Sequence, residues 1–343
     1  MSHFFYKSLM LTALLSSAPA AAMADDSSPA YDFLNITSST RAYGLGGINI
    51  TTVDNDINLV GQNPALLGPE FDLQVGVNYM RWLGESNFAG ATVGGRADSH
   101  SGWAGFVQYY GYGDFKEADN EGNITGKFSA KDLVFGGVYS RDITERLRGG
   151  VALKMVYSAY AEYSAFALAT DLGINYYNPE RDLSLSAVVT NLGGQVKRFN
   201  DSYDRLPVDV RLGWAKSFGN LPVRFSVTAW NLTKWHLPYV DSGDGSADSS
   251  DKIKDSFSTN LFRHLIFGAD FIPSDRFHIG IGYNYKTRTD MSTYARNILS
   301  GFSIGAGLKV RGFSIGIAYA QPHSDGSTFM FNVSSNLSEF LRK

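Results

Sequence analysis

The chain has 343 residues, a formal net charge of −3 and no cysteine. The missing cysteine excludes a disulfide framework, thiolate catalysis and a lipidated cysteine anchor, and the acidic balance offers no basic surface for nucleic acid. Charged residues make up 18% of the chain, below the ~25% of soluble domains, while 36 glycines, 19 tyrosines and 23 phenylalanines favour sheet over helix. Beyond the N-terminal segment, no stretch is apolar for the ~18 residues of a transmembrane helix. We therefore expect an all-β protein.

Residues 1–24 contain the three regions of a secretory signal peptide in their usual order: a positively charged region, an apolar region and a cleavage site. Lys7 supplies positive charge, residues 9–15 are apolar, and Ala-Met-Ala at 22–24 is a cleavage site of the A-x-A type. The apolar stretch is shorter than the ~20 residues of a membrane-spanning helix. A buried helix of the mature fold is the alternative, and the order of parts disfavours it. We predict a mature chain that starts near Asp25 and lies beyond the inner membrane.

Residues 25–69 precede the first predicted strand and have weak periodicity. If the strands that follow close into a barrel, a segment of this length is expected to fold into the lumen as a plug. Within it, Asn63 would cap a turn or helix whose first position is Pro64. A flexible periplasmic tail is the alternative, although the aromatic and aliphatic content of the segment argues against disorder.

From residue 70 onward the periodicity is two, as Phe277, Ile279 and Ile281 alternate with His278 and Gly280. Fourteen such segments are predicted, at residues 70–81, 86–97, 101–112, 130–141, 146–160, 163–177, 180–190, 206–219, 221–231, 260–273, 275–286, 299–310, 312–321 and 326–337. Most exceed the ~5–6 residues of soluble strands and reach the ~9–11 tilted residues that cross a bilayer. An even strand number is typical of bacterial outer-membrane barrels. We predict a 14-stranded antiparallel transmembrane β-barrel over residues 70–343.

One face of these segments is apolar, and the other carries glycine, serine, alanine, asparagine and scattered charges. A soluble β-sandwich, the alternative, would have many lysines and glutamates on its outer face, whereas a small polar face suits a crowded lumen. We expect Phe277, Ile279, Ile315 and Ile317 to face lipid. The residues expected to face the lumen are Asp72, Lys154, Asp171, Arg211, His264, Asp270, His278 and Lys309.

The longest links follow odd-numbered strands, at 113–129, 191–205, 232–259 and 287–298, whereas tight turns follow the even-numbered strands. Outer-membrane barrels keep short turns in the periplasm and long loops outside. Both chain ends are therefore expected in the periplasm, and residues 232–259 at the cell surface.

An aromatic and aliphatic cluster within the longest surface loop is the candidate partner-binding site, because such side chains dominate interface energies. The alternative is that these residues cap the rim of the barrel itself. The cluster consists of Trp235, Leu237, Tyr239 and Val240.

Two G-x-S-x-G sequences, at 301–305 and 312–316, resemble the nucleophile elbow of hydrolases. That elbow needs a corner between a strand and a helix, and both sequences lie inside uninterrupted strands. The histidines form no metal-binding pair, and the acidic segment 241–251 lacks the ligand order of a calcium loop. We predict a protein that is not an enzyme and has no catalytic residue, cofactor or metal.

Four consecutive stretches resemble the PorQ family of the type IX secretion system, which is related to the FadL-like barrels of fourteen strands. They are Phe-Leu-Asn-Ile at 33–36, the segment 42–47, Asp-Asn-Asp-Ile-Asn-Leu at 54–59, and Gln-Asn-Pro-Ala-Leu-Leu at 62–67. The resemblance implies an accessory outer-membrane protein that anchors PorZ, a surface protein of the attachment complex, close to lipopolysaccharide. It also marks a plug motif, which is Asn58, Asn63, Pro64 and Ala65.

The other candidate function is a FadL-type passive channel for hydrophobic small molecules. Such a channel needs an apolar pocket of ligand size near the plug. The lumen predicted here is polar, because Asp171, Arg211 and His264 are expected to point into it, and this counts against the channel. An open porin is disfavoured too, since fourteen strands and a plug leave little free bore.

Overall fold

The computed structural model describes residues 29–54, 56–118, 121, 123–199, 203–218, 221–241, 252–290, 299–323 and 326–341. The predicted signal peptide at 1–24, most of the acidic segment 241–251, and the N-terminal end of the chain lie outside the described residues. Among the described residues, no helix is both long and apolar enough to cross a membrane.

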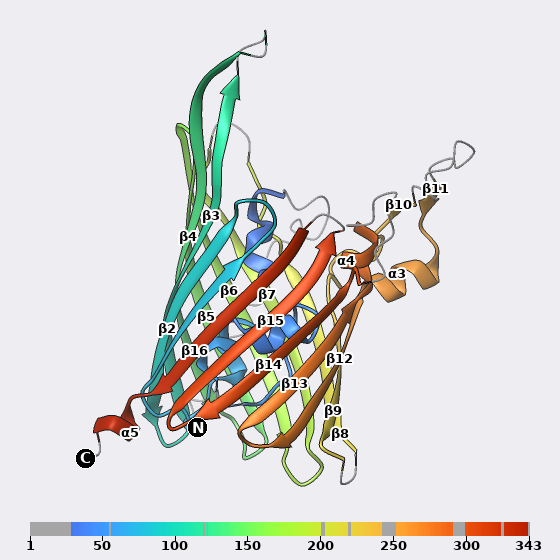
Figure 1. The fold of residues 1–343 in the computed structure, drawn as a ribbon. Helices are drawn as coiled ribbons and strands as arrows, with labels where there is room; N and C mark the ends of the chain where they lie inside the picture. The colour runs from blue at the N-terminus through green and yellow to red at the C-terminus, as the bar shows by residue number, and fades with distance from the viewer. Residues whose placement is uncertain are drawn as a thin grey trace, which may run out of the picture.

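Within the described residues, fourteen antiparallel strands form one closed barrel (Figure 1). The strands are β1 (Gln74–Arg81), β2 (Asn87–Asp98), β3 (Ser101–Ala118), β4 (Ile124–Asp142), β5 (Leu147–Tyr160), β6 (Tyr163–Asn178), β7 (Leu183–Lys197), β8 (Asp209–Ser217), β9 (Val223–Ala229), β12 (Leu265–Ser274), β13 (Phe277–Asn284), β14 (Phe302–Val310), β15 (Phe313–His323) and β16 (Gly326–Asn336). Each strand pairs with its neighbours along the barrel, and β1 pairs with β16 from Gln74↔Asn336 to Arg81↔Phe329. The predicted 14-stranded barrel is confirmed.

The outer face of the barrel is apolar along its strands. Ile315 and Ile317 on β15 and Ile281 on β13 are 40%, 46% and 51% exposed, which is far too open for a soluble core. Phe277 and Ile279 share this face and are half-buried. Because such a band of exposed isoleucine and phenylalanine is stable only against lipid, the fold is that of an outer-membrane barrel.

The inner face holds most of the charges expected there. Lys154 and Asp171 form a buried ion pair of 2.7 Å between Nζ and Oδ2, and the buried Arg211 guanidinium donates to Asp209 at 2.8 Å. Asp72 does not belong to the barrel wall, because β1 begins two residues later, at Gln74. His264 lies not in the lumen but at the rim of the barrel, where its ring nitrogens contact the backbone carbonyls of Trp230 and Trp235.

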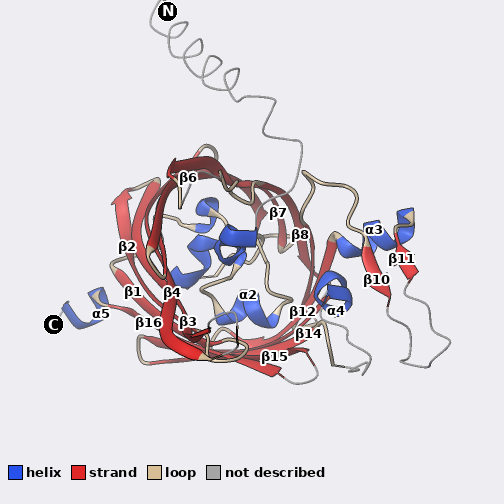
Figure 2. Cartoon of the chain, turned by 90° about the horizontal axis from the view of Figure 1, so that it is seen from above, coloured by secondary structure: helices blue, strands red, loops and turns tan. Residues whose placement is uncertain are grey.

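The segment before β1 crosses the lumen as a plug. Its elements are η2 (Pro29–Asn35), α2 (Thr40–Gly44), η3 (Ile57–Gly61) and η4 (Pro64–Leu66). Seen from above, its helices lie inside the ring of strands (Figure 2). We call the barrel end with the links 198–208 and 230–264 the long-loop end, and the opposite end the short-turn end.

The plug runs the length of the lumen. Near its start, the Tyr31 hydroxyl accepts a hydrogen bond from Gln195 Nε2 at 2.9 Å, close to the long-loop end of β7. Near its finish, Glu70 forms a 2.8 Å ion pair with Arg148, at the short-turn end of β5. The first described residues of the plug therefore lie at the long-loop end, and its last residues lie at the short-turn end, beside the start of β1. The last described helix, α5 (Ser338–Leu341), lies at the short-turn end, where Leu337 N donates to Leu73 O.

Three surface segments differ from the sequence prediction. The predicted loop 113–129 is largely strand, because β3 and β4 pair as far as Ala118↔Ile124 and rise above the barrel (Figure 1). Cross-strand stacking of Phe115 on Phe128, with ring centroids 5.3 Å apart, stabilises this extension.

The other differences are helical. Residues predicted to begin the tenth strand form α3 (Phe257–Arg263), whose N-terminus is capped by the Ser256 hydroxyl accepting from Thr259 N. Those predicted to end the eleventh form α4 (Tyr285–Asp290). Between β9 and α3, the short strands β10 (Tyr239–Asp241) and β11 (Lys252–Lys254) pair as a separate hairpin.

Candidate functional site

Glycines on the inner wall make room for the plug. A Cβ on Gly282 would lie 2.0 Å from Gly46 N, and a Cβ on Gly150 would lie 2.4 Å from Pro64 C. These distances are shorter than any normal carbon contact, and the atoms approached are backbone atoms that cannot rotate away. The glycine-rich face therefore fits the wall to the plug instead of lining open space.

The two G-x-S-x-G sequences belong to this contact. The Ser303 hydroxyl accepts from Gly46 N at 3.0 Å and donates to Gly44 O at 3.1 Å. In the second sequence, a Cβ on Gly316 would lie 2.1 Å from the Thr40 hydroxyl oxygen. Both sequences therefore hold α2 and the turn after it against β14 and β15.

Replacing Gly282 with valine is expected to displace the plug without opening the barrel, because the new side chain occupies the position of the Gly46 backbone. Trypsin cleavage within residues 29–71 of the folded protein measures the displacement. Gly137→Val is the control, since a Cβ at Gly137 meets no atom within 4 Å. Equal protection of the plug in both variants would contradict the wedged arrangement.

The four plug-motif residues are buried and shape the plug itself. Asn63 Oδ1 accepts from Ala65 N at 2.9 Å, and Asn63 Nδ2 donates to Ile50 O at 3.1 Å, with Pro64 in the first turn of η4. Asn58 donates to Oδ1 of Asp56 through its backbone and its side-chain amide. Burial raises the pKa of Asp56, and these hydrogen bonds oppose the shift.

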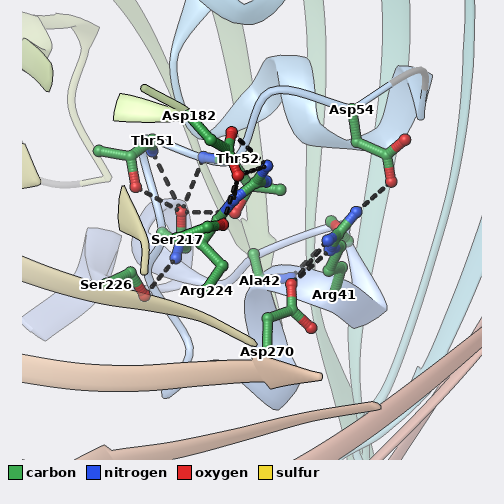
Figure 3. A network of polar contacts seen from close by, with 12 residues as sticks. Arg41, Ala42, Thr51, Thr52, Asp54, Asp182, Ser217, Arg224, Ser226 and Asp270 are labelled. Carbon is green, nitrogen blue, oxygen red and sulfur yellow. Dashed lines mark hydrogen bonds and ion pairs between the residues drawn. The ribbon is translucent and has the colours of Figure 1, made fainter. Parts of the chain in front are cut away.

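A buried charge network joins the plug to the wall. The Arg41 guanidinium on α2 donates to Asp270 Oδ2 on β12 at 2.9 and 2.6 Å and also pairs with Asp54 of the plug (Figure 3). Lys309 on β14 reaches the other oxygen of Asp54 at 2.6 Å. Buried charges are stable only when they are paired and hydrogen-bonded. The network therefore fixes the position of α2 in the lumen.

At the long-loop end the lumen is apolar on one side. Aromatic rings of the plug and wall pack there, with Phe33 5.0 Å from Tyr110, and Tyr110 5.1 Å from Phe88. Met80 and Met330 are fully buried in the same cluster. The polar lumen expected from sequence is therefore found only in part at this end: large apolar residues take over the inward register of β1, β2 and β16, whereas the buried Asp132 and the Asp209–Arg211 pair keep other parts of the wall polar.

A cavity of about 180 Å³ opens beside this cluster, between the plug and β13–β15. Its apolar lining includes Ile36, Tyr43, Trp82, Trp230 and Phe302. The polar side chains that line it are neutral, and none of the described residues in its lining is charged. These polar residues are Asn35, Thr37, Asn284, Thr287 and Ser303.

One wall of this cavity carries an unsatisfied donor. The indole Nε1 of Trp230 is buried and has no hydrogen-bond partner in the described part of the chain. A buried N–H without an acceptor is costly in a native protein, and an acceptor atom on a bound molecule would satisfy it. The cavity thus combines an apolar wall with one available hydrogen-bond donor.

The candidate partner-binding residues pack largely against their own rim. Trp235 stacks on His264 with ring centroids 5.1 Å apart and stays partly exposed. Leu237 is buried, and the Arg263 guanidinium lies 5.0 Å from the Tyr239 ring centroid. Val240 pairs with Ile253 in the β10–β11 hairpin, and its side chain is outside the described structure. Sequence reasoning missed the more exposed neighbours, which belong to β11 and α3.

Among the residues that the structure describes, no group of three or more histidine, aspartate or glutamate side chains could hold a metal ion. The geometry instead defines a plugged outer-membrane barrel with an apolar cavity at its long-loop end.

Comparison with solved structures places this fold beside outer-membrane channels. The Pseudomonas putida toluene transporter TodX matches with a TM-score of 0.56 and 11% identity, over 90% of this chain and 100% of that one. A Pseudomonas aeruginosa FadL homologue matches with a TM-score of 0.51 and 12% identity, over 88% and 98%. The monoaromatic hydrocarbon channel CymD gives 0.50 and 11%, over 89% and 97%.

These likenesses establish a FadL-like barrel fold of fourteen strands. No protein-family model and no curated protein matches the sequence. The TodX structure is named as a toluene transporter and the CymD structure as a monoaromatic hydrocarbon channel.

Proposed function

We propose that this protein is a passive, non-enzymatic channel that admits small, neutral, hydrophobic molecules through the outer membrane. The observation that carries the proposal is the apolar cavity of about 180 Å³ at the long-loop end, between the plug and the wall. A molecule arriving from outside meets this cavity before it meets the charged half of the plug. The names of similar structures, among them a toluene transporter, support the same substrate class.

The lining of the cavity favours a neutral ligand over a fatty acid. A buried carboxylate needs a cationic or multiple hydrogen-bonding partner, because its desolvation otherwise costs several kcal/mol. Among the residues that the structure describes, no arginine, lysine or histidine lines the cavity. An aromatic ring lies favourably against Trp82 and Tyr43, and a weak acceptor on it could accept a hydrogen bond from the Trp230 N–H.

Replacing Ala320 with phenylalanine is expected to abolish most uptake of a neutral aromatic probe, because the buried Ala320 borders the cavity and the larger ring would fill it. The measurement is initial uptake of radiolabelled toluene, with labelled oleate as the second probe, by cells that lack their own channel. Ala306→Phe on the lipid-facing side of β14 is the matched control. Toluene uptake that Ala320→Phe leaves intact would overturn the cavity as the route.

The second candidate function is the anchoring of a surface protein, a PorZ-like partner, as the resemblance to the PorQ family implies. The extension of β3 and β4 favours it, because this hairpin stands well above the barrel and exposes Ile124, Phe115 and Phe128. The test is a pull-down from solubilised outer membrane with and without residues 114–128. A partner lost with the hairpin, together with no toluene uptake by the wild type, would favour the anchor over the channel.

A further inference from the structure

A lateral arm extends sideways from the long-loop end of the barrel. We define it as residues 234–241 and 252–263, which include β10, β11 and α3. Figure 1 shows α3 level with the upper ends of β12 and β13, and Figure 2 shows that the arm lies outside the ring of strands. The arm therefore projects over the surface that surrounds the barrel instead of covering its mouth.

The arm exposes large apolar side chains. Ile253 is 75% exposed, Phe257 69% and Phe262 49%, and Leu261 and Trp235 are also open. A cluster of exposed apolar side chains indicates a surface that contacts a membrane or another protein.

The arm is held rigidly in this position. Asn260 on α3 accepts from Leu237 N at 2.9 Å and donates to Asp255 Oδ1 at 2.7 Å. The Arg263 guanidinium pairs with Asp290 of α4 at 2.5 Å. These bonds turn the polar residues of α3 toward the protein and leave its phenylalanines outside.

The exposed face of the arm continues the lipid-facing surface of the barrel. Phe262 meets Tyr285 edge to face, with ring centroids 6.2 Å apart. On the neighbouring strand β13, the Tyr283 ring packs on Phe302 with ring centroids 4.7 Å apart, and Ile281 is exposed on the lipid-facing side. Aromatic residues collect where a membrane protein meets the interface between lipid tails and headgroups. The apolar surface therefore runs without a break from the strands to α3.

From this continuity we propose that the arm rests on the outer leaflet of the membrane. Phe257 and Phe262 lie at the boundary between acyl chains and headgroups. The proposal is independent of what the lumen conducts.

Because the chain contains no cysteine, a single introduced cysteine can be labelled at one defined position. Phe257→Cys and Phe262→Cys, each carrying a nitroxide label, are reconstituted in vesicles of phosphatidylcholine and phosphatidylglycerol. Collisions of the label with oxygen, which concentrates in lipid, are compared with collisions with a water-soluble nickel chelate. Ile317→Cys is the lipid reference, and Ile124→Cys, an exposed apolar position on the β3–β4 hairpin, is the water reference. Heat-modifiable migration on gels verifies that each variant is folded.

Labels at Phe257 and Phe262 are expected to resemble the label at Ile317, with a higher oxygen-to-nickel collision ratio than at Ile124. Ratios equal to that at Ile124 would place the arm in water and overturn the proposal. Labels that are water-exposed in vesicles but shielded from both reagents in native outer membrane would also overturn it, and would assign the arm to a protein partner.

Discussion

Replacing Ile317 with arginine is expected to lower the free energy of unfolding in lipid vesicles by about 2–4 kcal/mol, the cost of a cation at the bilayer midplane on the lipid face of a barrel. Ile317 lies midway along β15, points outward, and pairs with Ala306 and Phe331. Urea titration of the protein folded into phosphatidylcholine vesicles, followed by heat-modifiable migration, measures the change.

Ile124→Arg is the control, because Ile124 is the more exposed of the two yet lies on the β3–β4 extension, which rises above the barrel. Its substitution is expected to change the free energy of unfolding far less. Equal losses at both positions would mean that Ile317 does not lie in the hydrocarbon of the bilayer.

Replacing Arg41 with methionine is expected to cost about 3–5 kcal/mol, because removal of one partner leaves a buried charge uncompensated. Asp270 is 1% exposed, and its Oδ1 already has no hydrogen-bond partner among the described residues. Asp54 keeps its contact with Lys309, so the loss falls on the junction between α2 and β12. We expect lower stability in urea and a higher single-channel conductance in planar bilayers, because α2 loses its anchor to the wall.

The matched control is Arg146→Met, which removes an arginine from an ion pair with Glu180 at the short-turn end. That pair is 3.2 Å long, with side chains 43% and 74% exposed. Exposed pairs contribute about 0–1 kcal/mol, so neither stability nor conductance should change measurably. Unchanged conductance in Arg41→Met would show that the network does not hold the plug.

Alternation of apolar and small residues was enough to predict all fourteen strands, because both faces of a membrane barrel impose a period of two. The secondary-structure prediction fails beyond the barrel, where lipid and lumen no longer impose a period of two. Residues 260–263 and 285–286 lie past the lipid band, so local capping by Ser256 and contacts between α3 and α4 decide their helical structure. Pairing of β3 with β4 beyond the barrel depends on a cross-strand partner that a single segment does not reveal.

The candidate site was less accessible to sequence reasoning. The presence of a plug follows from the length and composition of residues 25–69, but its contacts join positions far apart, such as Gly46 and Ser303. The apolar part of the lumen was missed because Phe88 and Val134 lie in the inward register of strands whose outer face is apolar too. Where both faces are apolar, periodicity cannot identify the one that faces inward.

The plug also bears on how the barrel is assembled. It precedes β1 in the chain, yet α2 bonds to the last strand, where Thr40 donates to Asn332 at 2.5 Å and Tyr43 meets Thr328. The segment that precedes the first strand is therefore fastened to the last strand, which pairs with β1 to close the barrel. Both ends of the barrel sequence meet at one place in the wall, and the plug is bonded to that wall from the inside.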